Sequence, residues 1–237
     1  MAIHTGAGVE ELKAAANGVT ARIRMKDGKV ETGEYSHAIV AIGIVPNSEN
    51  IGLEALGVKT TKGHIDTDAM CRTNVPGLWA IGDVTAPPWL AHKATHEAII
   101  AVEAIAGQHP HAMDVRNIPG CTYCRPQIAS VGLTEAKAKE AGYEVKVGTF
   151  PFIGNGKAIA LGEAEGFTKT IFDAKTGELL GAHMIGAEVT EQIQGYTIGK
   201  TAELVEDDFI ATVFPHPTLS ETMHESVLAA LGRPLHI

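Results

Sequence analysis

One stretch near the C-terminal end, Phe214–Glu221, restricts the local fold more than any other part of the chain. Pro217 disfavours helical backbone at the residue before it, so His216 is expected to lie extended, on the approach to a helix and not inside one. An apolar repeat at four-residue spacing predicts that helix over about 218–231: Leu219, Met223, Val227 and Leu231. We expect Thr218 to cap its start, and Gly232 followed by Pro234 to end it.

The two polar side chains His216 and Glu221 have two interpretations. A histidine titrates near neutral pH, and a carboxylate one turn later can fix its tautomer and stabilise the imidazolium. His216 is then a candidate catalytic base, and Glu221 is the residue that orients it. The spacing Thr218-x-x-Glu221 also matches a capping box, in which the glutamate satisfies a backbone N–H group and does no chemistry. Spacing alone leaves both interpretations open.

The whole string His-Pro-Thr-Leu-Ser-Glu at 216–221, followed by an amphipathic helix, resembles the C-terminal signature of the dihydrolipoamide dehydrogenases, which are flavin disulfide oxidoreductases. The resemblance implies that His216 and Glu221 form an acid/base pair that works on the disulfide of the partner subunit in a homodimer. Glutathione reductase has a related signature with His-Pro-Thr and a glutamate. Leu219, directly after the threonine, favours the lipoamide enzymes.

A second candidate site follows a short apolar strand predicted at 78–81. Gly82 ends that strand and Asp83 stands at its carboxyl end, where ligands of open α/β sheets bind and a carboxylate can accept hydrogen bonds from polyol hydroxyls. The alternative is a simple turn, which both residue types favour. A helix ending at Gly107 is predicted next, with its N-terminus near Asp83, where it would stabilise negative charge. Its predicted apolar face consists of Leu90, Ala94, Ala98, Ile99, Val102 and Ala106.

The same family resemblance extends to this region. The pattern Thr73-x5-Trp-Ala-Ile-Gly-Asp is similar to the family's second flavin-binding motif, which implies that Gly82 and Asp83 bind FAD, with Asp83 on the ribityl chain. The segment 89–94 looks like the family's next segment, in which the helix start contacts the flavin ring. The implied flavin contacts are Trp89, Leu90, Ala91 and His92.

An apolar run at 38–42 ends at Gly43, a pattern typical of a strand in a sheet that is covered on both faces. The segment 38–47 resembles a strand at the edge of the family's nicotinamide domain, which implies that Gly43 contacts NAD. The family commonly has arginines before the following Pro-Asn. This chain has Ile44 and Val45 there, so those side chains offer no polar contact.

The expected fold class is α/β combined with α+β. The resemblance implies three parts: the tail of an NAD domain over 1–47, the tail of an FAD domain over 48–115, and a complete interface domain over 116–237. In the last part we predict strands at 128–133, 167–172 and 179–185, the latter two as an antiparallel hairpin. Helices are predicted over about 188–204 and 218–231, and strands followed by helices indicate a separate α+β domain.

The cysteines raise an alternative of a different class. Cys121 and Cys124 have the spacing of a redox or zinc pair, with His109 and His111 upstream, so a non-catalytic dimerisation module that holds zinc is conceivable. His92 and His96 have ligand spacing on a helix, but no third ligand is evident, and we predict no metal site. Cys71 is interpreted as a small buried residue.

The composition of the chain limits which binding partners and which cellular compartment are expected. A formal charge of −9 argues against nucleic acid or an anionic membrane as a partner. No apolar run approaches the ~20 residues of a membrane span, and Met1-Ala2-Ile3 does not begin a signal segment, so the cytoplasm is expected.

Three family motifs are missing from these residues: an N-terminal Gly-x-Gly-x-x-Gly, a Cys-x4-Cys redox pair and a second glycine-rich loop. We therefore expect a fragment. The resemblance implies that its parent enzyme oxidises dihydrolipoamide carried by the lipoyl-bearing subunits of 2-oxoacid dehydrogenase complexes, with FAD and NAD as cofactors. The isolated fragment is expected to be inactive.

Overall fold

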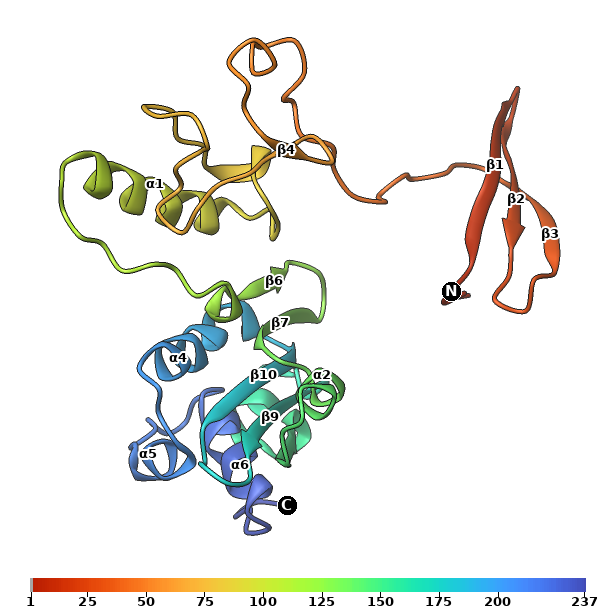
Figure 1. Ribbon diagram of the computed structural model, residues 1–237. Helices are drawn as coiled ribbons and strands as arrows, with labels where there is room; N and C mark the ends of the chain where they lie inside the picture. Colours follow the sequence, from red (N-terminus) through yellow and green to blue (C-terminus); the bar gives the residue numbers. More distant parts are fainter. Residues whose placement is uncertain (1) are drawn as a thin grey trace. The chain divides into compact units, whose positions relative to one another are not determined.

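The computed structural model describes residues 2–237, and the chain divides after Ile51 into two compact units (Figure 1). The first unit is built on an antiparallel sheet of β1 (Gly8–Ala15), β2 (Gly18–Arg24) and β3 (Val30–Tyr35), in that order. The turn between β2 and β3 has Gly28 at φ +87°, and Asp27 Oδ1 accepts the N–H of Lys29 at 3.0 Å. This is the geometry expected of an Asp-Gly hairpin turn.

The predicted buried strand at 38–42 is wrong. Residues 37–41 have no regular secondary structure, and Ile39 and Ile42 are each 93% exposed. A strand that is buried on both faces needs neighbouring strands and two covering layers. The sheet of β1–β3 provides neither for this segment, so its apolar side chains lie open.

The second unit begins with loops and short elements: β4 (Thr60–Thr61), β5 (His64–Ile65), the 3₁₀ helices η1 (Gly82–Val84) and η2 (Val115–Asn117), and the helix α1 (Ala91–Ile105). The strand predicted at 78–81 is reduced to one bridge between Trp79 and Arg72, with backbone hydrogen bonds from Ala80 to Cys71 and from Thr73 to Leu78. The left-handed Gly82, at φ +76°, then turns the chain away.

The helix α1 forms where it was predicted, but its predicted buried face is wrong. Its buried residues are Lys93, Glu97, Ile100 and Ala101. Ile99 and Val102, from the predicted apolar face, are 49% and 63% exposed. The buried face therefore includes two charged side chains, which form an ion pair described below.

A five-stranded antiparallel sheet forms the main part of the second unit, in the order β6-β7-β10-β9-β8. Its strands are β6 (Gly120–Thr122), β7 (Gln127–Gly132), β8 (Val145–Pro151), β9 (Phe167–Asp173) and β10 (Leu179–Gly186). The predicted hairpin is confirmed, since β9 and β10 pair with Met184 opposite Thr168. The helices of this part are α2 (Glu135–Glu140), α3 (Gly156–Leu161), α4 (Val189–Thr201), α5 (Glu206–Ala211) and α6 (Glu221–Ala230), with the 3₁₀ helix η3 (Phe152–Gly154) between β8 and α3.

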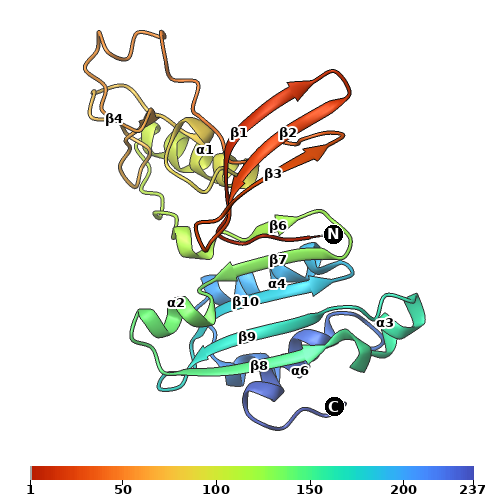
Figure 2. The same ribbon diagram turned by 90° about the vertical axis from the view of Figure 1, so that its right-hand side faces the viewer.

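Helices cover both faces of this sheet, with α4 and α6 on one face and α2 on the other (Figures 1 and 2). The strands alternate accordingly, since neighbouring residues of a strand point to opposite faces. Phe172 packs in the larger core with Tyr196 and Val227, whereas Ile171 packs with Ala138 of α2. Within residues 2–237 no helix combines the length and apolar character needed to cross a membrane.

The packing of α6 on β8 depends on a glycine. A Cβ atom at Gly148 would overlap the backbone of α6 at Ser226 and Ala230. The absent side chain therefore lets the helix lie directly on the strand, where Val227 and Ser226 are fully buried. This close approach sets the position of α6, and with it the position of Glu221 at its first residue.

We predict that Gly148→Ala lowers the free energy of unfolding by about 1–3 kcal/mol, because an added methyl group in a packed interface forces backbone shifts. Gly120→Ala in β6 is the matched control, since its Cβ would meet only Ser130 Oγ at 3.8 Å. We expect that control to change stability by no more than about 1 kcal/mol. Urea unfolding of the two variants measures both values, and equal stabilities would contradict the prediction.

Candidate functional site

The side chains of His216 and Glu221 meet at the start of α6. His216 lies in the preceding loop, and its Nδ1 is 2.9 Å from Glu221 Oε1. The other carboxylate oxygen, Oε2, accepts the backbone N–H of Thr218 at 2.9 Å. The hydrogen bonds expected from the two interpretations are both present, because one oxygen orients the imidazole and the other satisfies the backbone.

The predicted capping role of the Thr218 side chain is wrong. Its hydroxyl donates to the carbonyl of Pro215 at 2.7 Å, and the helix N-cap is Ser220. The apolar repeat is correct for Leu219, Met223 and Val227, all of which are buried. Leu231 lies just after the last residue of α6 and is only partly buried.

The geometry determines which imidazole nitrogen can act as a base. An ionised carboxylate only accepts hydrogen bonds, so Nδ1 of His216 carries the proton and donates it to Glu221. Nε2 is then the free, basic nitrogen. The side chain of His216 is 78% exposed and that of Glu221 is 25% exposed. The basic nitrogen can thus reach a reacting group that another molecule supplies.

The electrostatics keep Glu221 charged. Its partial burial acts to raise the pKa of its carboxyl group, but the hydrogen bond from Thr218 N–H, the hydrogen bond and charge of His216, and the charge of His236 together lower the pKa below its ordinary value. The hydrogen bonds outweigh the burial because they stabilise only the ionised form. Glu221 is therefore an anion at neutral pH.

A second histidine–carboxylate pair lies one helical turn further on, and sequence reasoning missed it. The buried carboxylate of Glu225 accepts the backbone N–H of Leu235 at 3.0 Å, and its other oxygen is 2.7 Å from His236 Nδ1. The chain end is thereby held against α6. The only signal in the sequence was the four-residue spacing of the two glutamates, which predicts that both lie on one face of the helix.

The Gly82–Asp83 turn forms in η1, directly against α1. The Asp83 carboxylate is exposed and makes no hydrogen bond or ion pair with residues 2–237. The backbone of Gly82 is held at both ends, since its N–H donates to Glu97 Oε2 at 2.8 Å and its carbonyl accepts from Thr85 Oγ1 at 2.8 Å. The ion pair of Lys93 and Glu97 supports this turn, and sequence reasoning missed it.

The N-terminus of α1 is open to a ligand. Its N-cap is Leu90, whose side chain has no atom that can accept a hydrogen bond, and there is no acidic residue in the first turn. The N–H groups of the first turn therefore keep their capacity to bind an anion or a carbonyl oxygen. Trp89 is fixed beside them, because its Nε1 donates to Thr85 O at 3.1 Å and its ring stacks on His64 at 5.0 Å.

The predicted site residues form separate groups. Gly82 and Asp83 lie with Trp89, Leu90, Ala91 and His92 around η1 and the start of α1. His92 Nε2 is 2.8 Å from the carbonyl oxygen of Pro119, so its side chain is already engaged. No hydrogen bond or ion pair in the described part of the chain links this group to His216 and Glu221. Gly43 belongs to the first unit, where it is exposed at φ +119°.

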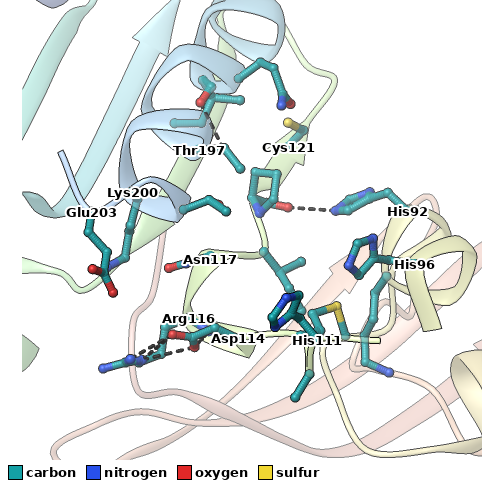
Figure 3. A pocket seen from close by; sticks show the side chains of 18 of the residues that line it. His92, His96, His111, Asp114, Arg116, Asn117, Cys121, Thr197, Lys200 and Glu203 are labelled. Carbon is teal, nitrogen blue, oxygen red and sulfur yellow. Dashed lines mark hydrogen bonds and ion pairs between the residues drawn. The ribbon is translucent and has the colours of Figure 1, made fainter. Parts of the chain in front are cut away.

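A cavity of about 910 Å³ lies between the first turns of α1, the segment 111–119 and α4. Figure 3 shows His92, His96 and His111 on one side of it and Lys200 and Glu203 on the other. Burial lowers the pKa of Lys200, whose ammonium donates to Leu179 O at 3.4 Å. Charges of both signs line the cavity, so its chemistry selects no particular class of ligand.

The cysteine pair does not form a disulfide. Cys121 is half-buried against the core with Sγ 3.9 Å from Thr190 O, and burial raises the pKa of its thiol. Cys124 is exposed, and Cys71 is buried as predicted. Across residues 2–237, no group of three or more His, Cys, Asp or Glu side chains could hold a metal ion. The zinc alternative therefore receives no support from the geometry.

The lowered pKa of Glu221 predicts a pH-dependent difference between the chain and a Glu221→Gln variant. A carboxyl group whose pKa is lower in the folded state contributes stability above its unfolded pKa of about 4.3, and loses it as the pH falls through the folded value. We expect the stability difference to shrink as the pH falls below about 4.3. Urea unfolding of both proteins from pH 3 to 7 measures it. A difference that grows as the pH falls below about 4.3 would contradict the assignment.

Comparisons with known proteins agree with the geometry. Residues 1–98 match the family model described as pyridine nucleotide-disulphide oxidoreductase, and residues 118–227 match that family's dimerisation domain. Dihydrolipoyl dehydrogenase of Zymomonas mobilis subsp. mobilis is 61% identical over 235 residues, which are 99% of this chain and 50% of that protein. The corresponding protein of Rhizobium etli is 55% identical over 99% of this chain and 49% of its own length. The chain thus spans about half the length of the curated relatives it matches.

Solved structures have the same fold. LpdA of Mycobacterium tuberculosis has a TM-score of 0.82 and 25% identity, covering 93% of this chain and 48% of that protein. The HOCl-induced flavoprotein disulfide reductase RclA of Escherichia coli has a TM-score of 0.81, with 24% identity over 93% of this chain and 50% of that protein. The mixed α/β fold and the family resemblance read from 216–221 and 73–83 are confirmed. The chain belongs to the pyridine nucleotide-disulphide oxidoreductase family.

Proposed function

We propose that this chain provides the base and part of the flavin site of a dihydrolipoyl dehydrogenase. That enzyme oxidises protein-bound dihydrolipoamide to lipoamide through a redox disulfide and FAD, with NAD as the electron acceptor. The observation that carries the proposal is the His216–Glu221 pair, in which a charged carboxylate holds Nδ1 at 2.9 Å and leaves Nε2 free. The high identity to two dihydrolipoyl dehydrogenases supports the substrate class.

In this mechanism His216 Nε2 takes the proton of a dihydrolipoyl thiol. The resulting thiolate can attack a disulfide sulfur, which forms a new S–S bond and releases the other sulfur as a thiolate. Glu221 stabilises the imidazolium that has formed, and its position keeps Nε2 directed away from α6. His216 then passes its proton to a released thiolate or to solvent, which returns the imidazole to its neutral form. The redox disulfide itself comes from outside these residues, since this sequence has no Cys-x4-Cys pair.

The residues around η1 and α1 fit a bound flavin. FAD, when bound, supplies the electron transfer between the disulfide and NAD. The exposed Asp83 carboxylate is suited to accept hydrogen bonds from ribityl hydroxyls, and Gly82 allows a close backbone approach. The uncapped N–H groups at Ala91 and His92, with Trp89 and Leu90 beside them, are suited to the electron-rich side of the flavin ring.

The remaining assignments rest on the same family. We assign residues 1–47 to the tail of an NAD domain, where Gly43 has nothing within 4 Å of its Cβ position and so leaves room for a nucleotide. Residues 48–115 are assigned to the tail of an FAD domain and residues 116–237 to the interface domain. A homodimer in the cytoplasm, acting on the lipoyl-bearing subunits of 2-oxoacid dehydrogenase complexes, completes the proposal.

The decisive experiment uses a hybrid in which residues 2–237 replace the matching half of the Zymomonas mobilis relative. We expect the purified hybrid to bind FAD and to reduce NAD with dihydrolipoamide. The 237-residue chain alone is expected to show no turnover, because it lacks the redox pair. A folded hybrid that reduces glutathione disulfide and ignores dihydrolipoamide would favour the related glutathione reductase activity.

In the hybrid, His216→Gln is expected to lower kcat by about 10²- to 10⁴-fold, which is the usual contribution of a positioned acid or base. The flavin spectrum and the FAD content should not change, because His216 is not among the flavin contacts. His109→Gln, at an exposed histidine outside the proposed site, is the control and should retain full activity. If the His216 variant kept more than a tenth of the wild-type kcat, its role as the base would be excluded.

The variant Glu221→Gln tests whether Glu221 sets the tautomer of the His216 imidazole. The amide oxygen can still accept the N–H of Thr218, but the amide nitrogen only donates. Nδ1 of His216 must then accept, which puts the proton on Nε2 and removes the base. We expect kcat to fall by about 10²-fold or more at pH 7, at a temperature at which urea unfolding shows the variant to be folded. Unchanged kcat with an unchanged pH profile would show that Glu221 only satisfies the backbone.

A further inference from the structure

The helix α1 buries an ion pair that the mechanism above does not use. Lys93 Nζ is 2.6 Å from Glu97 Oε1, and the two side chains are only 4% and 9% exposed. Lysine and glutamate are almost never buried to this extent unless they are paired. A buried ion pair is a weak source of stability, because the desolvation of both charges offsets their attraction. Its presence therefore calls for a reason other than stability.

Both members of the pair hold the turn that carries Asp83. Glu97 Oε2 accepts the N–H of Gly82, the residue before Asp83, at 2.8 Å. Lys93 Nζ donates to the hydroxyl of Thr85, two residues after Asp83, at 3.2 Å. That hydroxyl donates in turn to the carbonyl of Gly82 at 2.8 Å. The pair thus holds the backbone on both sides of Asp83 and leaves the Asp83 carboxylate free.

The turn is built around a left-handed glycine, and besides the contacts of the pair it has a backbone hydrogen bond from the N–H of Thr85 to the carbonyl of Gly82 at 3.0 Å. Since Lys93 and Glu97 belong to the first two turns of α1, the contacts also fix the distance between the turn and the N-terminus of that helix. The two groups that the proposed function directs at one ligand, the Asp83 carboxylate and the open N–H groups, are thereby held as one rigid unit.

The charge of the pair fits this position. A lone buried glutamate next to Gly82 would place a second negative charge beside Asp83 and beside any anionic ligand. Lys93 cancels that charge at 2.6 Å, so the carboxylate of Glu97 can accept the Gly82 N–H without repelling what Asp83 binds. The Thr85 hydroxyl, which accepts from Lys93, and the Cys71 thiol, which donates to the Glu97 carbonyl, carry no formal charge.

We propose that Lys93 and Glu97 are positioning residues of the flavin site, which act by holding the Gly82–Thr85 turn in register with the N-terminus of α1. The proposal rests on the proposed function, because FAD is the ligand it concerns. The pair does not touch the ligand in this scheme. It determines where the Asp83 carboxylate stands before the ligand arrives, which lowers the cost of ordering on binding.

The test is a double variant, Lys93→Met with Glu97→Met, in the hybrid described above. Replacing a buried ion pair with apolar side chains of similar volume is often neutral for stability. We therefore expect an unfolding midpoint of the apoprotein close to that of the unmodified hybrid. The Kd for FAD, titrated by the quenching of flavin fluorescence, is expected to rise about 10- to 100-fold, because the acceptor of the Gly82 N–H is lost. The absorbance spectrum of the bound flavin should shift as well.

Asp83→Ala separates this inference from the proposed function. If Asp83→Ala weakens FAD binding and the double variant binds FAD as the unmodified hybrid does, the positioning role is overturned and the flavin site stands. If neither the hybrid nor its Asp83 variant binds FAD, both are overturned. Should the double variant fail to fold, Thr85→Val decides, because it removes only the hydroxyl between Lys93 and Gly82. A weaker FAD affinity at an unchanged unfolding midpoint supports the proposal, and an unchanged affinity refutes it.

Discussion

The candidate catalytic pair depends on how the carboxylate of Glu221 divides its two oxygens. One oxygen holds the backbone of Thr218 and the other holds His216, so the loop and the imidazole are positioned by a single charged group. That group is in turn positioned by packing. Gly148 admits α6 directly onto β8, and Val227 is fully buried against the sheet. The proposed chemistry at Nε2 therefore depends on a close contact between a helix and a strand.

The same arrangement of hydrogen bonds recurs at the proposed flavin site and at the C-terminal end of the chain. In each case a carboxylate on a helix accepts a backbone N–H group from a segment outside that helix. Glu97 holds Gly82, and Glu225 holds Leu235. Each of these carboxylates also has a basic side chain on its second oxygen. An ionised carboxylate can do this because it offers several acceptor sites and forms stronger hydrogen bonds than a neutral group.

Predictions from apolar patterns were wrong where burial depends on neighbouring elements or on an oppositely charged side chain, neither of which the pattern includes. The run at 38–42 looked like a buried strand, but no neighbouring strand covers it in its unit, and Ile39 stays exposed. On α1 the apolar periodicity selected the face that includes Val102, whereas the buried face contains Lys93 and Glu97. A prediction from apolar periodicity counts every charged residue as one that is unfavourable to bury. It does not register that two opposite charges four residues apart can cancel each other and be buried together.

The sequence by itself determined the local features: the loop before α6, the apolar face of that helix, the hairpin of β9 and β10, and the spacing that brings Glu221 to His216. These follow from backbone sterics and from residues within one or two helical turns of each other. The tertiary structure alone decided which oxygen of Glu221 binds which group, that Thr218 does not cap the helix, and that Lys93 and Glu97 hold the Asp83 turn. Those outcomes depend on the packing of distant elements, which places each polar atom within hydrogen-bonding distance and which no local pattern specifies.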